Sequence, residues 1–300
     1  MAKERITLVE VGARDGLQNE LQTIPTELKI RLIDALAESG LPVIEATSFV
    51  SPKWVPQMAD HADVMRGITR KENVRYPVLV PNERGFNDAI AAGATEIAVF
   101  TAASEAFSQK NTNCSIDESF DRISAVLNLA KQKSIPVRGY LSCVLGCPYE
   151  GEVPLKQVVK VAEKLIDLGC YQVSLGDTIG IGTPNKARAL VQAVKQSVAI
   201  EQIAVHFHDT YAQALVNIYS AIEEGVRTVD SAVSGLGGCP YAPGAGGNVA
   251  TEDVVYMLSG MGIETGVDLP VLVKAGQLIC DYLGHAPRSK AALAISRANY

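Results

Sequence analysis

The sequence contains few of the residues that mark several classes of protein. Its six cysteines are spread over 300 residues, which is too sparse for a disulfide framework. Cys143 and Cys147 are four residues apart, but no second pair follows, so we do not expect a zinc site there. This use of cysteine is typical of a reducing compartment, and we expect a cytoplasmic protein.

Long apolar runs and clusters of basic residues are also missing. No stretch is long and apolar enough to span a bilayer, and Met1 leads almost directly into a predicted strand, so we expect neither a targeting segment nor a membrane anchor. The net charge of −6 argues against nucleic acids and anionic membranes as partners. With 47% hydrophobic residues, the chain is able to bury a large core.

What the sequence does contain is a regular alternation of apolar strands and amphipathic helices. Segments rich in branched apolar residues predict eight strands, at 6–12, 42–48, 74–80, 96–101, 137–144, 171–176, 203–208 and 228–233. Apolar residues at helical spacing predict helices between them, and several of these helices are followed by a glycine, as Gly40 shows.

The strict alternation determines the expected fold. It predicts parallel strands joined by right-handed crossovers, and eight such units close a (β/α)8 TIM barrel, an α/β fold. An open doubly wound sheet is the alternative, but no GxGxxG motif follows the first strand. We therefore expect one catalytic domain over residues 1–300, with the barrel at about 6–248 and a C-terminal helical extension at about 249–300.

Unusual polar residues follow the predicted strands. In a barrel of this kind the chemistry lies at the carboxyl ends of the strands. Arg14 and Asp15 follow the first strand, and Glu45 is near the end of the second. Asn111 is expected in the loop after the fourth strand, and Asp177 closes the sixth.

Two histidines in the seventh predicted strand indicate a metal site. His206 and His208 are at positions i and i+2, so both side chains should face the barrel mouth. A single histidine in an apolar strand is usually a core residue, but two of only four in the chain favour a metal. Asp15 can add a carboxylate, although alone it would be read as a turn residue before Gly16. Asn248 can add a carbonyl oxygen, and this set suits Mg²⁺ or Mn²⁺ best, with Zn²⁺ or Co²⁺ as alternatives.

Three charged residues of the first two strands have more than one interpretation. Arg14 offers planar donors that can stabilise a developing enolate or thioester oxygen, or it forms a surface ion pair. Glu10 and Glu45 lie within apolar strands, where a carboxylate is costly unless it is paired. Both could hold Arg14 or a lysine inside the barrel, and a catalytic role for Glu45 is equally open.

A glycine-rich stretch at 235–248 carries a single thiol. Its six glycines and two prolines exclude a helix or a central strand. It has neither the serine nor the charge of a usual linker, which favours a lid over an active site. Cys239 is then a proton donor or nucleophile, and the alternative is a small apolar residue.

These motifs together resemble the hydroxymethylglutaryl-CoA lyase family. The family typically has proline where Ala13 stands. The loop that carries Cys239 is the family's own signature, whereas the Arg-Asp-Gly and His-x-His elements are shared with a wider superfamily of metal-dependent barrels. The resemblance rests on VEVGARDGLQNE at 9–20, EATSFVSPKWVPQM at 45–58, GDTIG at 176–180, HFHDT at 206–210 and the whole loop at 234–248.

The resemblance implies an activity and a set of roles. The reaction is retro-Claisen cleavage of 3-hydroxy-3-methylglutaryl-CoA to acetyl-CoA and acetoacetate, as in leucine degradation and ketone body formation. Arg14 would stabilise the thioester oxygen, and Cys239 would protonate the carbanion. The metal would be held by Asp15, His206, His208 and Asn248, and Asp15 or His206 would be the base.

Further residues are implied to support these roles. Gln18 and Asn111 would bind substrate together with Arg14, while Glu45 and Asp177 would be supporting members of the catalytic set. The partner is then a small acyl-CoA, and we expect a homo-oligomer, most simply a dimer.

Two other functions stay open at the level of sequence. A Claisen-condensing synthase of the isopropylmalate or citramalate type would share Arg14, Asp15, His206 and His208, but it would lack the Cys239 loop. A barrel retained only for binding would show gaps in this polar set, and the sequence shows none.

Overall fold

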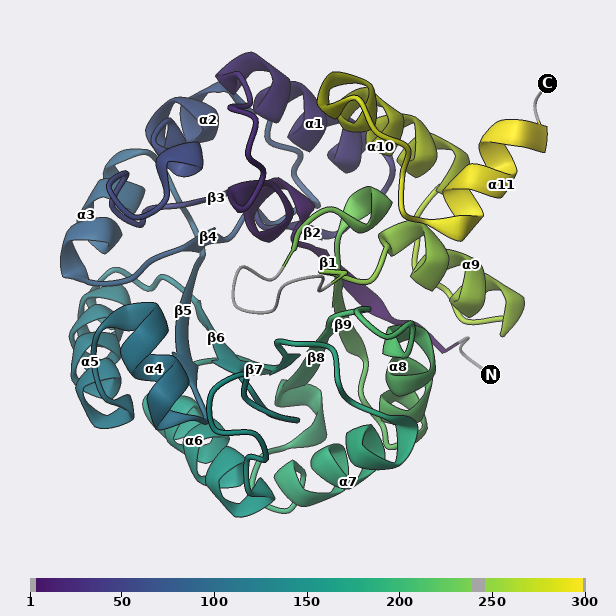
Figure 1. The fold of residues 1–300 in the computed structure, drawn as a ribbon. Coiled ribbons are helices and arrows are strands. Elements are labelled where there is room, and N and C mark those ends of the chain that lie inside the picture. Colours follow the sequence, from purple (N-terminus) through teal and green to yellow (C-terminus); the bar gives the residue numbers. More distant parts are fainter. Residues whose placement is uncertain (1–3, 239–245, 299–300) are drawn as a thin grey trace.

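The computed structural model describes residues 4–238 and 246–298, and its ribbon is a ring of strands inside a ring of helices (Figure 1). The strand segments form one parallel sheet in the order β2-β1-β9-β8-β7-β6-β5-β4-β3. They are β1 (Thr7–Glu10), β2 (Val43–Ile44), β3 (Thr47–Ser48), β4 (Val78–Leu79), β5 (Ile97–Ala102), β6 (Val137–Ser142), β7 (Gln172–Asp177), β8 (Ile203–Phe207) and β9 (Thr228–Ser231).

The ring closes through the second predicted strand, which is interrupted at Glu45 and divided into β2 and β3. Val43 of β2 pairs with Val9 of β1 and also bridges in parallel to Arg75, just before β4. Further along, β3 pairs with β4. Eight strand positions therefore close a barrel, and the predicted (β/α)8 fold is confirmed.

Helices surround the barrel and cover its outer face (Figure 1). α1 buries the apolar face that its spacing predicts, and α5 begins with a capping box made by Ser115 and Glu118. The helices are α1 (Thr26–Glu38), α2 (His61–Gly67), α3 (Glu83–Ala91), α4 (Glu105–Thr112), α5 (Ile116–Gln132), α6 (Leu155–Asp167), α7 (Pro184–Val194), α8 (Ala214–Glu223), α9 (Thr251–Gly260), α10 (Leu269–Leu283) and α11 (Lys290–Ala298).

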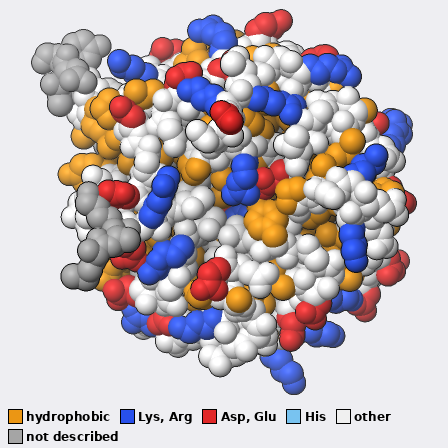
Figure 2. Space-filling model, turned by 180° about the vertical axis from the view of Figure 1, so that it is seen from behind, with side chains coloured by type: hydrophobic (Ala, Val, Ile, Leu, Met, Phe, Trp, Pro, Cys, Tyr) orange, Lys and Arg blue, Asp and Glu red, His pale blue; other side chains and the backbone are white. Residues whose placement is uncertain are grey.

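The carboxyl-terminal residues are helical as expected. In Figure 1, α10 lies beside α1 in the helical ring, and α11 lies outside it. Among the described residues, no helix combines the length and the apolar character needed to cross a membrane. Figure 2 shows acidic and basic side chains interspersed on the face behind that of Figure 1, so the drawn face presents no field of a single sign.

The two faces of the barrel strands differ in polarity. Alternate residues of a strand point to opposite sides, so Val137 and Leu141 of β6 join the apolar core under the helices. Arg138 and Tyr140 of the same strand point to the barrel interior, where they are part of a buried polar network. The main hydrophobic core thus lies outside the sheet, and the interior combines this polar network with a small apolar cluster of Leu79, Ala98 and Tyr140.

Candidate metal centre and active site

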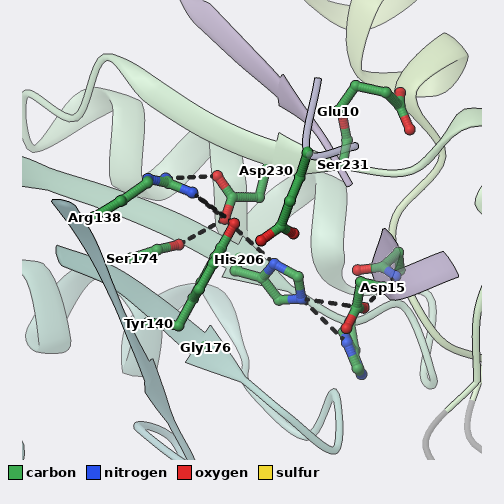
Figure 3. Close-up of polar contacts among 12 residues, drawn as sticks. Glu10, Asp15, Arg138, Tyr140, Ser174, Gly176, His206, Asp230 and Ser231 are labelled. Carbon is green, nitrogen blue, oxygen red and sulfur yellow. Dashed lines mark hydrogen bonds and ion pairs between the residues drawn. The ribbon is translucent and has the colours of Figure 1, made fainter. Parts of the chain in front are cut away.

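Three potential metal ligands meet at the carboxyl ends of β1 and β8. Asp15 follows β1, His206 lies in β8 and His208 directly follows that strand. One ligand atom from each lies within 4.8 Å of the others. Nε2 of His206 is 3.3 Å from Nε2 of His208 and 3.9 Å from Oδ2 of Asp15, and Figure 3 shows the His206 ring directed toward Asp15.

The local sequence explains why these side chains converge. β8 alternates, so Phe207 is buried in the outer core while the histidines on either side face inward. Asp15 lies in η1 (Gly12–Gly16), a π-helical turn where the sequence indicated only a simple turn. A Cβ at Gly16 would lie 2.8 Å from Cβ of Leu236, so glycine permits this close packing.

The ionisation states of these groups suit a divalent cation. Burial would raise the pKa of Asp15, but Arg14, the two histidines and a hydrogen bond from Asn248 together lower it to about 2. Burial, and next the neighbouring His206, lower the pKa of His208 to about 4. At neutral pH the site therefore offers a carboxylate and a neutral imidazole, the forms that bind metals, and the residues fit a cation with mixed N and O ligands.

A buried network orients His206 from behind. Asp230 of β9 lies with Oδ2 3.3 Å from Nδ1 of His206 (Figure 3). Arg138 donates to both oxygens of Asp230, at 3.0 and 2.7 Å, and Ser174 Oγ donates to Oδ2 at 2.7 Å. A proton on Nδ1 that is held by Asp230 leaves the Nε2 lone pair directed to the metal site, which is a common arrangement around metal-binding histidines.

This supporting network was not predicted from the sequence. A signal for it exists, because Arg138 and Asp230 are charges inside apolar strands, the same feature that drew attention to Glu10 and Glu45. Burial would raise the pKa of Asp230, but the charge of Arg138 and bonds from His206 and Arg138 lower it to about 2. Asp230 therefore stays ionised behind the histidine.

Arg14 bridges two carboxylates at the mouth. Nε donates to Oε2 of Glu45 at 2.7 Å, and Nη1 donates to Oδ1 of Asp15 at 2.7 Å. Its guanidinium carbon lies 5.4 Å from the centroid of the Tyr140 ring. Burial lowers the pKa of Arg14, but Glu45 and Asp15 raise it above its ordinary value, so the cation is permanent. Burial raises the pKa of Glu45, and Arg14 opposes that rise.

Asn248 and Gln18 both contact Asp15. Asn248 Nδ2 donates to Oδ2 of Asp15 at 2.8 Å and to the Leu236 carbonyl at 3.2 Å. Gln18 Nε2 donates to Oδ1 of Asp15 at 3.2 Å. These described bonds of Asn248 use its amide nitrogen, and its role as a metal ligand stays a prediction.

Glu10 and Asp177 make mainly structural contacts. Glu10 accepts bonds from the amides of Gly12 and Val233, at 2.7 and 2.8 Å, and from Thr251 Oγ1 at 2.6 Å, so it does not hold Arg14. Asp177 accepts from the amides of Ile181 and Gly182 and shapes the loop after β7. The role of Asp177 in catalysis stays a prediction.

Of the remaining predicted site residues, Asn111 lies apart from this cluster. Asn111 was expected in a loop, but it lies on the exposed side of α4, a helix whose mixed polar sequence did not predict it. Its role in substrate binding stays a prediction. Cys239 lies outside the described residues, although Gly238 beside it is placed by a bond from Asn19 Nδ2 to its carbonyl oxygen at 3.1 Å.

Comparisons with known proteins agree with this geometry. The model of the HMGL-like family matches residues 5–279. Mitochondrial hydroxymethylglutaryl-CoA lyase from Gallus gallus is 59% identical over 294 residues, covering 98% of this chain and 99% of the relative. Cytoplasmic 3-hydroxy-3-methylglutaryl-CoA lyase from Danio rerio is 60% identical over 285 residues, covering 95% and 85%.

Solved structures agree with the sequence relatives. The hydroxymethylglutaryl-CoA lyase of Pseudomonas aeruginosa matches with a TM-score of 0.97 and 56% identity over 99% of both chains. An HMG-CoA lyase from Acinetobacter baumannii, in complex with coenzyme A and 3-methylmalate, matches with a TM-score of 0.93 and 37% identity over 97% of this chain and 95% of that one. With the barrel, the mouth cluster and these likenesses in agreement, the chain belongs to the HMGL-like family, as its motifs predicted.

Proposed function

We propose that this chain cleaves 3-hydroxy-3-methylglutaryl-CoA to acetyl-CoA and acetoacetate, with a divalent cation held by Asp15, His206, His208 and Asn248. The observation that carries the proposal is the convergence of three ligand atoms within 4.8 Å, beside an arginine bonded to one of them. The high identity to lyases that bear this substrate's name supports the same substrate here.

Mg²⁺ or Mn²⁺ is the proposed ion, because two imidazoles, a carboxylate and an amide oxygen form a donor set without thiolate. When bound, the cation supplies Lewis acidity that lowers the pKa of the substrate's tertiary hydroxyl. The chain's own residues accomplish the remaining tasks, which are to bind the acyl-CoA, to orient it, and to move two protons.

Of the two candidate bases, Asp15 and His206, we propose Asp15. Nε2 of His206 is the nitrogen that faces the ligand cluster, so its lone pair is committed when a cation is held. A carboxylate has about four lone pairs on two oxygens, so Asp15 can bind a cation and accept the hydroxyl proton when one donor, such as Gln18, gives up its bond. His206, oriented by Asp230, then acts mainly as a ligand.

Loss of the hydroxyl proton lets the carbon–carbon bond break. The new ketone belongs to acetoacetate, and the bond's electron pair passes to the methylene carbon of acetyl-CoA as an enolate. Arg14, held by Glu45 and Asp15, stabilises the developing charge on the thioester oxygen, and Gln18 and Asn111 help to bind the substrate. Cys239 donates the proton that completes acetyl-CoA.

The decisive experiment incubates the purified protein with 3-hydroxy-3-methylglutaryl-CoA and Mg²⁺ and measures acetoacetate. We expect acetoacetate in step with substrate loss, abolition by EDTA and recovery with Mg²⁺ or Mn²⁺. A parallel arm supplies acetyl-CoA and a 2-oxo acid. Release of free CoA in that arm, with no acetoacetate in the first, would favour the Claisen-condensing synthase instead.

A single substitution tests the proposed proton donor. Cys239→Ala should lower kcat by about 10²-fold to 10⁴-fold, the usual contribution of a positioned acid, while Mn²⁺ affinity measured by calorimetry stays unchanged. Undiminished turnover would remove Cys239 from the mechanism. Cys114→Ala is the matched control, because that thiol is buried near α4 and should leave kcat unaffected.

Compartment and assembly are further parts of the proposal. Relatives are named for both mitochondria and cytoplasm. Of these two we propose the cytoplasm, which cell fractionation would test. We also propose a homodimer, which sedimentation equilibrium would distinguish from a monomer or a larger assembly.

A further inference from the structure

One arginine donates hydrogen bonds to two carbonyl groups of the glycine-rich stretch. Nη1 of Arg288 donates to the Gly237 carbonyl at 2.5 Å and to the Gly246 carbonyl at 2.6 Å. These carbonyls stand on either side of residues 238–245. Two carbonyl oxygens within reach of one nitrogen repel each other, and a charged donor between them offsets that repulsion.

The backbone segments at Gly237 and Gly247 approach each other closely. A Cβ at Gly247 would lie 2.3 Å from the Gly237 carbonyl oxygen, and Gly247 has a φ of +73° that disfavours other residues. The Gly247 carbonyl in turn accepts a bond of 2.8 Å from the amide of Asp209, directly after His208. Glycine makes the approach sterically feasible, but glycine also adds conformational freedom, so a fixed spacing needs a separate cause.

The spacing of these two segments bears on the metal centre. Asn248 follows Gly247, and its Nδ2 donates both to Asp15 Oδ2 and to the Leu236 carbonyl, next to Gly237. A Cβ at Gly237 would lie 2.9 Å from Nδ2 of Asn248. Any shift of Gly247 relative to Gly237 therefore moves the side-chain amide of Asn248 that contacts Asp15.

Arg288 is itself well anchored. Its amide donates to the Ser234 carbonyl at 2.9 Å. The three residues after it bind Asp253 of α9: Ser289 Oγ and the Ala291 amide reach Oδ1 at 2.8 and 2.7 Å, and the Lys290 amide reaches Oδ2 at 3.3 Å. The arginine thus bonds Gly237 and Gly246 from a segment that is also held by Asp253 of α9.

We propose that Arg288 is a positioning residue that fixes the spacing of Gly237 and Gly246 and thereby holds the Asn248 amide against Asp15. This rests on the proposed function only for its activity measurement, since metal affinity reports the same geometry without turnover. Arg288 supplies no ligand and contacts no reacting atom, so its effect passes through Asn248.

The test compares Arg288→Ala and Arg288→Lys with the native protein. Calorimetry with Mn²⁺ alone should show affinity about tenfold weaker in Arg288→Ala, the usual scale for residues that orient metal ligands. The kcat should fall by at least a similar factor, with KM for the acyl-CoA changed less than about threefold. Arg288→Lys should recover most of both, because an ammonium has three donors and can serve two carbonyls.

Controls separate positioning from other roles. Arg297→Ala removes an exposed arginine of α11 and should behave as native. If Arg288→Ala binds Mn²⁺ within twofold of native, the proposal is wrong. A tenfold rise in KM with native Mn²⁺ affinity would overturn it too, in favour of a direct contact with substrate. If the native protein cleaves no substrate, the proposed function fails, and the Mn²⁺ comparison still decides the role of Arg288.

Discussion

Two pairs of carboxylates near the barrel mouth ionise in opposite ways. Asp15 and Asp230, on the histidine side of the mouth, have pKa values lowered to about 2. Glu10 and Glu252, beneath the start of the glycine-rich stretch, have pKa values raised to about 7 and about 8.

The difference lies in their partners. Burial raises the pKa of all four groups, but arginines adjoin the two aspartates, Arg14 beside Asp15 and Arg138 beside Asp230. Glu10 has backbone amides and a hydroxyl as partners, and Glu252 binds the amide of Ser234. Neutral donors lower the pKa too little to overcome burial. An arginine together with neighbouring histidines therefore keeps the two aspartates charged, whereas Glu45 shares Arg14 and still has a raised pKa. Neutral donors suffice where a carboxyl only supports the backbone.

The largest change in stability should follow from removing the arginine beside a buried aspartate. Arg138→Met leaves Asp230 buried without its ion-pair partner, which we expect to lower the free energy of unfolding by about 3 to 5 kcal/mol in urea titrations. Arg66→Met is the control, since its pair with Asp63 is 62% and 73% exposed and should contribute less than about 1 kcal/mol. Equal losses in the two variants would mean that the buried pair has no special role.

Binding of Mn²⁺ beside the ionised Asp15 should stabilise the folded protein. Mn²⁺ at about 100 times its Kd should raise the free energy of unfolding by about 2.7 kcal/mol, because it binds only the folded site. EDTA should reverse the gain. His206→Ala should lose it, whereas a gain that survives in this variant would locate the metal elsewhere.

The neutral side should respond to pH. The folded state holds a proton on Glu10 up to about pH 7, whereas the unfolded chain releases it near the ordinary value of 4.5. Its stabilising contribution is therefore complete below about pH 4.5 and is lost as pH rises through about 7, at a cost on the order of 3 kcal/mol. Glu10→Gln should flatten this part of the urea stability curve, and Glu72→Gln, at an exposed position, should leave the native slope.

Much of the fold and part of the site could be predicted because both depend on local patterns. The alternation of strands and helices gave the barrel, and the spacing of His206 and His208 indicated that they share a face. Asp15 was expected beside them because the ends of parallel strands meet at one rim.

What could not be predicted depends on long-range pairing or on weak patterns. Arg138 and Asp230 are 92 residues apart, so the sequence shows two costly charges without showing that they meet. The break between β2 and β3 at Glu45 has no turn residue to announce it. The helix that contains Asn111 buries little more than Phe107 and Ser108, so its amphipathic signal is faint.

The widened turn at Gly12–Gly16 has a consequence for protein engineers. It lets the side chains of two adjacent residues, Arg14 and Asp15, meet from a single stretch of backbone, which a regular strand does not permit. Transplanting only the aspartate and the two histidines into another barrel should therefore yield a scaffold that captures an ion and lacks the guanidinium next to it. The unit to graft is the five-residue loop with its glycines.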